Sequence, residues 1–278
     1  MRRAFGPLRI GLEFLAVAAA LAIFVGPLLF ILFTAGKNSQ EAAAMNLSLP
    51  AHPQYWKNIV AVVQASNYML VRAFVNSLIL TVSSMAILVF VSSMAGFVME
   101  RRRGKFIAPA HFLILVGLML PPSVITTIWV LQGLALYKTL AGLILVEVAL
   151  GFPFAVLLYR AFMVTVPREL DEAALMEGAS SGQLFFRIIF PLLQPVSATV
   201  IVLSSVNVFN DFVNPLYFLP GAKNATIQLT LYNFLSRYST QWNLLFTDVL
   251  LVTIPPLLCF IFFNRQIVAG MTAGAIKS

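Results

Sequence analysis

Charged residues are scarce in this chain: Asp, Glu, Lys and Arg make up 10% of it, while 60% of its residues are hydrophobic. Soluble domains carry roughly 25% charged residues, so the composition excludes a soluble enzyme and a disordered scaffold. The one cysteine, Cys259, excludes an internal disulfide framework. The two histidines, His52 and His111, lie far apart without a cysteine cluster and give no basis for a metal site. A mean hydropathy of +0.92 indicates an integral membrane protein.

The positive charge is concentrated at the ends of apolar runs. A formal net charge of +8 is compatible with nucleic-acid binding, but such binding needs a continuous basic face. Lys and Arg at the ends of apolar runs instead mark loops that stay in the cytoplasm. We therefore expect no nucleic-acid partner and interpret the charge as a signal of membrane topology.

Six apolar runs have the length of roughly 20 residues that a membrane-spanning helix needs. They cover about 12–34, 73–99, 106–131, 140–163, 192–219 and 245–263. Six spans place both termini on one side, and that side carries twelve of the 18 Lys and Arg residues. The excess predicts that both termini lie in the cytoplasm. Two long loops, about 35–72 and 220–244, then face outward.

The segment 164–190 is the one long inward loop with mixed charge and helix-forming residues. Acidic residues after Pro167 favour the start of a short helix, and Gly178 is placed to end it. Ser180 and Gln183 then resemble a capping box that opens a second short helix. By these patterns alone, the first helix either docks on another protein or lies in the headgroup region. The chain holds no phosphate-binding Gly-x-x-x-x-Gly-Lys-Ser/Thr loop.

The same segment resembles the EAA loop of ABC-importer permeases. The resemblance rests on Glu172-Ala173-Ala174, followed by Gly178, Ile188 and Pro191 at the family's spacing, with Phe190 where Leu is usual. The C-terminal residues are similar to those of the smaller, six-span permease subunit of maltose-type carbohydrate importers. They are Arg265, Gly270, Thr272, Gly274, Ala275 and Lys277, with Asn264 and Ser278 as departures. The resemblance covers essentially the whole chain.

This resemblance implies an all-α fold, that of a type I ABC importer permease. The chain would be a multi-pass protein of the bacterial inner membrane, with one permease domain, a cytoplasmic coupling helix and a cytoplasmic tail at 264–278. Its partners would be membrane lipid, a second homologous permease, two ATP-binding subunits and an extracytoplasmic sugar-binding protein. It would hold no catalytic residue and no cofactor, because the partner ATPase binds ATP and Mg.

Two sets of residues would contact the ATPase. The coupling set is Glu172, Ala173, Ala174, Met176, Gly178 and Ala179. The tail set is Gly270, Thr272, Gly274 and Lys277.

Polar side chains inside the spans suggest a substrate path. Polar residues of the fifth span recur at helical spacings of three and four, and they are Ser204, Asn207, Asn210, Asp211 and Asn214. Amides and a carboxylate match the hydroxyl groups of a sugar. The stripe faces either a substrate path or another helix. Glu147 in the fourth span either shares the cavity or pairs with the partner chain.

The predicted function is import of a neutral sugar or oligosaccharide by alternating access, driven by a separate ATPase through the EAA loop. Glycerol phosphate or another sugar phosphate is the alternative substrate, which a fixed cation near the path would favour. A proton-coupled secondary transporter and a purely structural subunit are alternatives of a different class.

Overall fold

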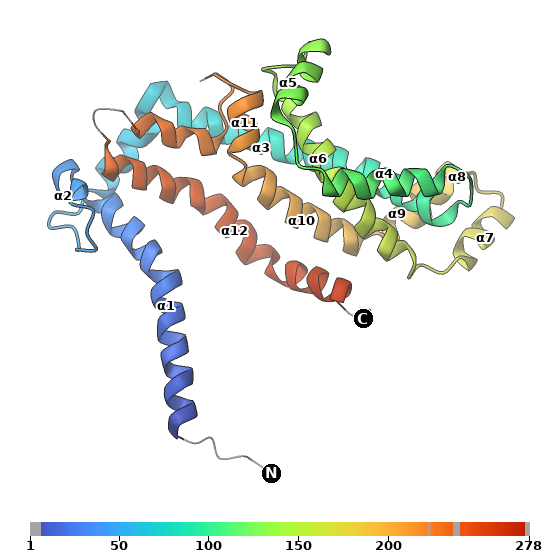
Figure 1. Cartoon of the computed structure of the whole chain (residues 1–278), viewed down its shortest axis with the longest axis horizontal. Helices are drawn as coiled ribbons and strands as arrows, with labels where there is room; N and C mark the ends of the chain where they lie inside the picture. The colour runs from blue at the N-terminus through green and yellow to red at the C-terminus, as the bar shows by residue number, and fades with distance from the viewer. Residues whose placement is uncertain (1–6, 222, 236–239, 276–278) are drawn as a thin grey trace. The chain divides into compact units, whose positions relative to one another are not determined.

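The computed structural model describes residues 7–221, 223–235 and 240–275, and it contains helices and no strands within these ranges (Figure 1). This confirms the all-α prediction. The chain divides into two compact units. Unit 1 comprises Met1–Val71 and Thr230–Ile254, and unit 2 comprises Arg72–Leu229 and Pro255–Ser278.

Three helices of the described residues are long and apolar enough to cross a membrane: Leu12–Gly36 of α1, α3 and α6. A fourth candidate is a pair of helical segments, Ser181–Leu192 and Gln194–Asn210, bent by 70° at the break. Three shorter apolar helices complete the set: Ile107–Met119, Val124–Gly133 and Trp242–Leu258. The predicted count of six spans stays a prediction.

Unit 1 is held together by a buried polar network at the end of α1 (Pro7–Gly36). Asn58 donates from Nδ2 to the backbone oxygens of Ala35, at 2.8 Å, and Lys37, at 2.9 Å. Asn243, in α12 (Trp242–Ala275), donates to Asn58 Oδ1 at 3.2 Å. These buried hydrogen bonds join the end of α1, the start of α3 and α12 within unit 1. The short helix α2 (Ser39–Ala43) follows α1 and is capped by Asn38.

The long helix α3 (Tyr55–Arg101) is broken at residues 65–68, where the backbone is not helical. Ser66, Asn67 and Tyr68 have φ values of 48°, 58° and 58°, in the left-handed region that side chains disfavour. The residues before the break therefore form a helix within the predicted loop 35–72, and the predicted second span corresponds to the part after it. The other long predicted loop contains the 3₁₀ helix η2 (Ile227–Phe234).

The second part of α3 packs in unit 2 against α6 (Leu140–Met163), whose bounds are those predicted for the fourth span. A Cβ on Gly96 of α3 would lie 2.6 Å from Tyr159 Cβ, so only a glycine permits this approach. Tyr159 in turn donates a hydrogen bond to Ser197 Oγ at 2.8 Å and so ties α6 to α10 (Gln194–Asn210). These three helices form the frame of unit 2.

The predicted third span is two helices, α4 (Ile107–Met119) and α5 (Val124–Gly133). Between them, Leu120 is extended, with φ −76° and ψ 130°. The cause is Pro121-Pro122, because a proline lacks the N–H that continues a helix and disfavours helical backbone at the residue before it.

The predicted fifth span is also interrupted. The helix α10 ends at Asn210, Asp211 is extended, and α11 (Val213–Phe218) begins anew. In a continuous helix, Pro215 would sit four residues after Asp211 and clash with its carbonyl group. The prediction that the polar residues from Ser204 to Asn214 form a stripe on one helix is therefore wrong.

The segment between α6 and α10 contains α7 (Glu169–Met176), α8 (Ser181–Gln183), the π-helix η1 (Leu184–Ile189) and α9 (Phe190–Leu192). At the other end of the chain, α12 continues through Pro255-Pro256 and beyond the predicted sixth span to Ala275. Most of the predicted tail is thus part of this helix.

Candidate functional site

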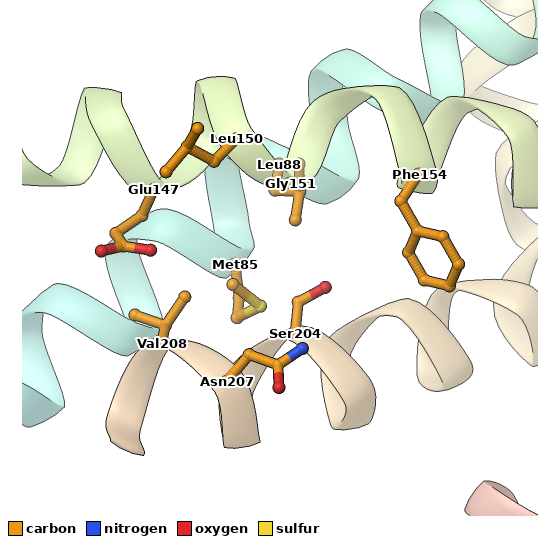
Figure 2. Close-up of a pocket in the computed structure, with 9 residues that line it drawn as sticks. All are labelled: Met85, Leu88, Glu147, Leu150, Gly151, Phe154, Ser204, Asn207 and Val208. Atoms are coloured by element: carbon orange, nitrogen blue, oxygen red, sulfur yellow. The ribbon is translucent and has the colours of Figure 1, made fainter. Parts of the chain in front are cut away.

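A pocket of about 250 Å³ lies in unit 2 between α6 and α10, with α3 behind it (Figure 2). Its polar groups are the Glu147 carboxyl group, the Ser204 hydroxyl group and the Asn207 amide. Phe154 lines the end away from Glu147 (Figure 2). The remaining lining residues are Met85, Leu88, Leu150, Gly151 and Val208. Hydrogen-bonding groups therefore face an aromatic and aliphatic surface across one small space.

Glu147 is buried, with 8% of its surface exposed, and it joins the pocket to α11. Its Oε1 accepts a hydrogen bond from Asn214 Nδ2 at 3.2 Å. The carboxyl group of Asp211 lies beside it and interacts with it. The structure thus brings Asp211 and Asn214 next to Glu147, and of these residues and Asn207, Glu147 and Asn207 line the pocket.

Asp211 has a local structural role that sequence spacing did not indicate. Its Oδ1 accepts hydrogen bonds from the backbone N–H groups of Val213, at 2.9 Å, and Asn214, at 3.3 Å. An aspartate in this position stabilises the first turn of a helix by satisfying its free N–H groups. The carboxylate therefore caps α11 at the edge of the pocket.

Asn210 does not line the pocket. Its Oδ1 accepts a hydrogen bond from Gln228 Nε2 at 3.2 Å, which connects the end of α10 to η2 within unit 2. Of the five residues proposed for a substrate path, Glu147 and Asn207 line the pocket, Asn214 and Asp211 lie beside Glu147 at its edge, and Asn210 makes a contact away from it.

Sequence spacing missed Leu150, Gly151 and Phe154 as pocket residues. They follow Glu147 by three, four and seven positions, so they lie on its face of α6. Counting positions at the helical period from Glu147 would have identified them from the sequence. Met85 and Leu88 lie on another helix and had no such signal.

Four of the six proposed coupling residues belong to α7 and two follow it, and most of the six are exposed. Met176 is 89% exposed, and Glu172, Ala173 and Gly178 are also open to the surroundings. Ala174 differs, because it is buried against the core of unit 2 and is not available to another protein. Ala179 is half-buried against the same core.

Two consecutive turns after α7 have the local structure that the sequence predicts. Gly178 follows α7 with φ +82°, the left-handed conformation that favours glycine. Ser180 and Gln183 form a reciprocal capping box at the start of α8. The loop therefore carries one exposed short helix, α7, which is followed by two well-defined turns.

The proposed tail contacts are only partly described. Gly270, Thr272 and Gly274 belong to α12, and Lys277 lies outside the described residues. Within the described ranges, no group of three or more His, Cys, Asp and Glu side chains is arranged to hold a metal ion.

A helical membrane fold with an internal pocket and an exposed loop helix is typical of a transport subunit. Residues 88–273 match the family described as "Binding-protein-dependent transport system inner membrane component". The chain belongs to this family, which confirms the resemblance that the EAA spacing predicted. It is an inner-membrane permease component of a binding-protein-dependent transporter.

Curated relatives cover nearly the whole chain. A probable ABC transporter permease protein of Bacillus subtilis, YurM, is 31% identical over 90% of this chain and 83% of its own length. The probable starch degradation products transport system permease protein AmyC of Thermoanaerobacterium thermosulfurigenes is 30% identical over 96% of both chains.

One similar solved structure is a bacterial ABC transporter involved in the import of the acidic polysaccharide alginate. The match covers 95% of this chain and 99% of the transporter's chain, with a TM-score of 0.79. At 16% identity this similarity shows the fold alone. The MetNI methionine ABC transporter is similar over 73% of this chain and 96% of its own chain, with 17% identity and a TM-score of 0.53.

Proposed function

We propose that this chain is the permease subunit through which an ABC importer moves a neutral sugar or oligosaccharide. The observation that carries the proposal is the pocket between α6 and α10. Glu147, Ser204 and Asn207 offer acceptors and donors to sugar hydroxyl groups, and Phe154 offers an apolar face to a ring. A space of about 250 Å³ is slightly below the range of roughly 300–1,000 Å³ for drug-sized ligands. It therefore suits contact with one ring of a longer substrate.

The charge of the pocket favours a neutral substrate over a phosphorylated one. Glu147 is the one ionisable residue among those that line it, and Asp211 beside it is also acidic. A phosphate needs a cation, usually Arg, close to its path. Neither a lysine nor an arginine belongs to the described lining, so this pocket offers a sugar phosphate no cation.

Names of relatives support a carbohydrate substrate. They include the starch degradation products permease AmyC and the arabinooligosaccharides transport system permease protein AraQ of Bacillus subtilis, 28% identical over 92% of this chain. A sugar or oligosaccharide is the substrate class common to these names.

The energy for transport comes, in this proposal, from a separate ATPase that docks on α7. A second homologous permease completes the pore, two subunits bind ATP, and an extracytoplasmic binding protein delivers the sugar. Both termini and the loop 164–190 then lie in the cytoplasm. The exposed side chains of α7, among them Met176, are the surface on which the ATPase would act.

The test is the ATPase activity of the purified complex in lipid with its binding protein, across a panel of neutral sugars and glycerol phosphates. Stimulation by a neutral sugar is the expected result. Stimulation only by a phosphorylated compound overturns the substrate class and retains the importer. If no compound stimulates and no ATPase co-purifies, the coupling role of α7 is wrong.

A further inference from the structure

The helix α7 is too short to hold its own position. It has eight residues, whereas isolated helices shorter than about 12–15 residues are marginal in water. Ala174 is its one buried residue. Contacts from the rest of unit 2 must therefore fix where the exposed face of α7 points.

The last residue of α3 supplies the shortest of these contacts. Arg101 Nε lies 2.7 Å from Asp171 Oδ2, and the two side chains are only 9% and 14% exposed. The same guanidinium group donates from Nη2 to the backbone oxygen of Val166 at 2.8 Å. One arginine thus binds both α7 and the chain that leads into it.

The neighbouring residue Glu100 makes a second set of contacts with the same region. Its Oε2 accepts a hydrogen bond from Arg160 Nε, near the end of α6, at 3.2 Å. Its backbone oxygen accepts one from Arg168 Nη2 at 3.1 Å. The end of α3 is therefore bound to the chain before and after loop residues 164–167. Within α7 itself, the residue that contacts the end of α3 is Asp171.

The other end of this contact leads to the pocket. Arg101 follows Leu88 by 13 residues in one continuous part of α3, a length of about 20 Å at 1.5 Å per residue. Leu88 and Met85 line the pocket, and Gly96 packs closely on Tyr159 between the two ends. A tightly packed helix moves as a rigid element, so a shift at Arg101 is carried to Met85 and Leu88.

We propose that the Arg101–Asp171 ion pair is the link through which displacement of α7 is transmitted to α3 and from there to the pocket. Arg101 is a positioning residue, because it acts through Asp171 and touches neither substrate nor ATP in this scheme. The transport consequence rests on the proposed function. The placement of α7 by Arg101 does not depend on it.

The sequence provides a matched control beside the residue itself. Arg102 and Arg103 follow directly, carry the same charge and are exposed. If only the local positive charge matters, Arg102→Ala will act like Arg101→Ala. If the buried ion pair matters, only the change at Arg101 will have an effect.

The experiment uses the complete complex in lipid nanodiscs and measures amide hydrogen exchange in residues 165–178. In Arg101→Ala we expect exchange in α7 to rise by roughly tenfold, because buried ion pairs are strongly disrupted when one partner is removed. Arg102→Ala should exchange like the wild type. Arg101→Lys keeps the positive charge but lacks the planar guanidinium group with its several N–H donors. We therefore expect an intermediate exchange rate in α7 and a folded complex. Wild-type exchange in Arg101→Ala overturns the proposal.

The second measurement is the ratio of sugar transported to ATP hydrolysed in the same variants. We expect this ratio to fall by about tenfold in Arg101→Ala and in Asp171→Ala, within the range typical of coupling between sites. The double variant should be no worse than either single one, because both remove the same contact. Fully additive losses overturn the proposal. Absence of sugar-stimulated ATPase in the wild type refutes the proposed function instead, and the exchange measurement still decides the role of Arg101.

Discussion

Asn214 donates a hydrogen bond to Glu147 across 3.2 Å, although 67 residues separate the two in the chain. The bond attaches α11 to α6 at the point where Glu147 lines the pocket. Because Glu147 is buried, this amide is part of what compensates the removal of its carboxyl group from water. The pair therefore shapes one wall of the proposed sugar site.

Replacing Glu147 tests that wall directly. In Glu147→Leu the Asn214 amide loses its acceptor, at a cost of roughly 1–3 kcal/mol, and the pocket loses its acidic group. We expect sugar uptake to fall by up to about tenfold, because a lost hydrogen bond to the passing sugar raises the barrier by about 0.5–1.5 kcal/mol and each 1.36 kcal/mol is tenfold in rate. Glu147→Gln retains an acceptor oxygen and should transport substantially better than Glu147→Leu. Equal uptake in the two variants would contradict the proposed hydrogen-bonding role.

Two variants of Asp211 separate the effect of its negative charge from its role as the cap of α11. Asn caps helices about as well as Asp, whereas Ala costs about 0.5–2 kcal/mol at such a position. We expect Asp211→Asn to keep α11 ordered and Asp211→Ala to lower both thermal stability and uptake, while basal ATPase activity is unchanged in both. Thermal unfolding and uptake assays on the same preparations check this. A loss of uptake in Asp211→Asn that equals the loss in Asp211→Ala would show that the charge, and not the cap, matters.

Gly178 offers a test of the turn after α7. Its φ of +82° is strained for any residue with a side chain, by roughly 1–2 kcal/mol. We expect Gly178→Ala to reduce sugar-stimulated ATPase activity while the complex still assembles. Gly182→Ala is the control, because a Cβ at either glycine meets no atom within 4 Å but Gly182 lacks the positive φ. If both variants lose activity alike, backbone conformation at Gly178 is not the cause.

The Arg101–Asp171 pair should make coupling sensitive to acid. Burial raises the pKa of Asp171 above its ordinary value of about 3.9; Glu172 adds to this rise, whereas Arg101 and Arg168 act to lower the pKa. Since the folded loop then binds the proton more tightly than the unfolded chain, protonation does not destabilise the fold through this group. It removes the charge of the pair. As the pH is lowered, the coupling ratio should therefore begin to fall while the pH is still above about 3.9.

Asp171→Asn is the matching variant for this titration. We expect its coupling ratio to be low at neutral pH, and the wild-type ratio to approach it on acidification. If the wild-type complex and the Asp171→Asn complex keep parallel pH profiles, another group titrates.

Close packing of α3 on α6 predicts a stability effect at Gly96. A methyl group there would lie 2.6 Å from Tyr159 Cβ and 3.1 Å from the backbone nitrogen of Arg160. Overpacking of this kind costs typically about 1–3 kcal/mol, so Gly96→Ala should lower the unfolding temperature by several degrees. Gly133→Ala meets no atom within 4 Å and should not. The comparison is made by thermal unfolding in the same lipid or detergent.

Features that depend on residues close together in the chain could be predicted from the sequence. The apolar run 140–163 gave the bounds of α6, and the turn at Gly178 and the Ser180–Gln183 box follow from residues within a few positions. The end of α10 could also have been predicted, because Pro215 cannot follow Asp211 by four positions inside a helix. Counting polar residues at helical spacing overlooked that proline.

Contacts between distant residues could not be predicted in the same way. Arg101 stands in a run of three arginines, and nothing in the run distinguishes the one that reaches Asp171. Ala174 belongs to a pair of alanines that looked equivalent, yet it is buried and Ala173 is exposed. Tertiary packing decides both cases, and local pattern contains no information about it.

The helix α11 has six residues, too few to persist without support. Near its start, Asp211 caps it and Asn214 attaches it to Glu147; at its end, the Phe218 backbone oxygen accepts a hydrogen bond from the Lys138 N–H group at 3.1 Å. The helix α11 therefore stays folded only while its start and its end are both held in place. Local unfolding of α11 would therefore respond to any molecule that competes for Glu147, so proteolysis or exchange within 213–218 is a direct reporter of pocket occupancy.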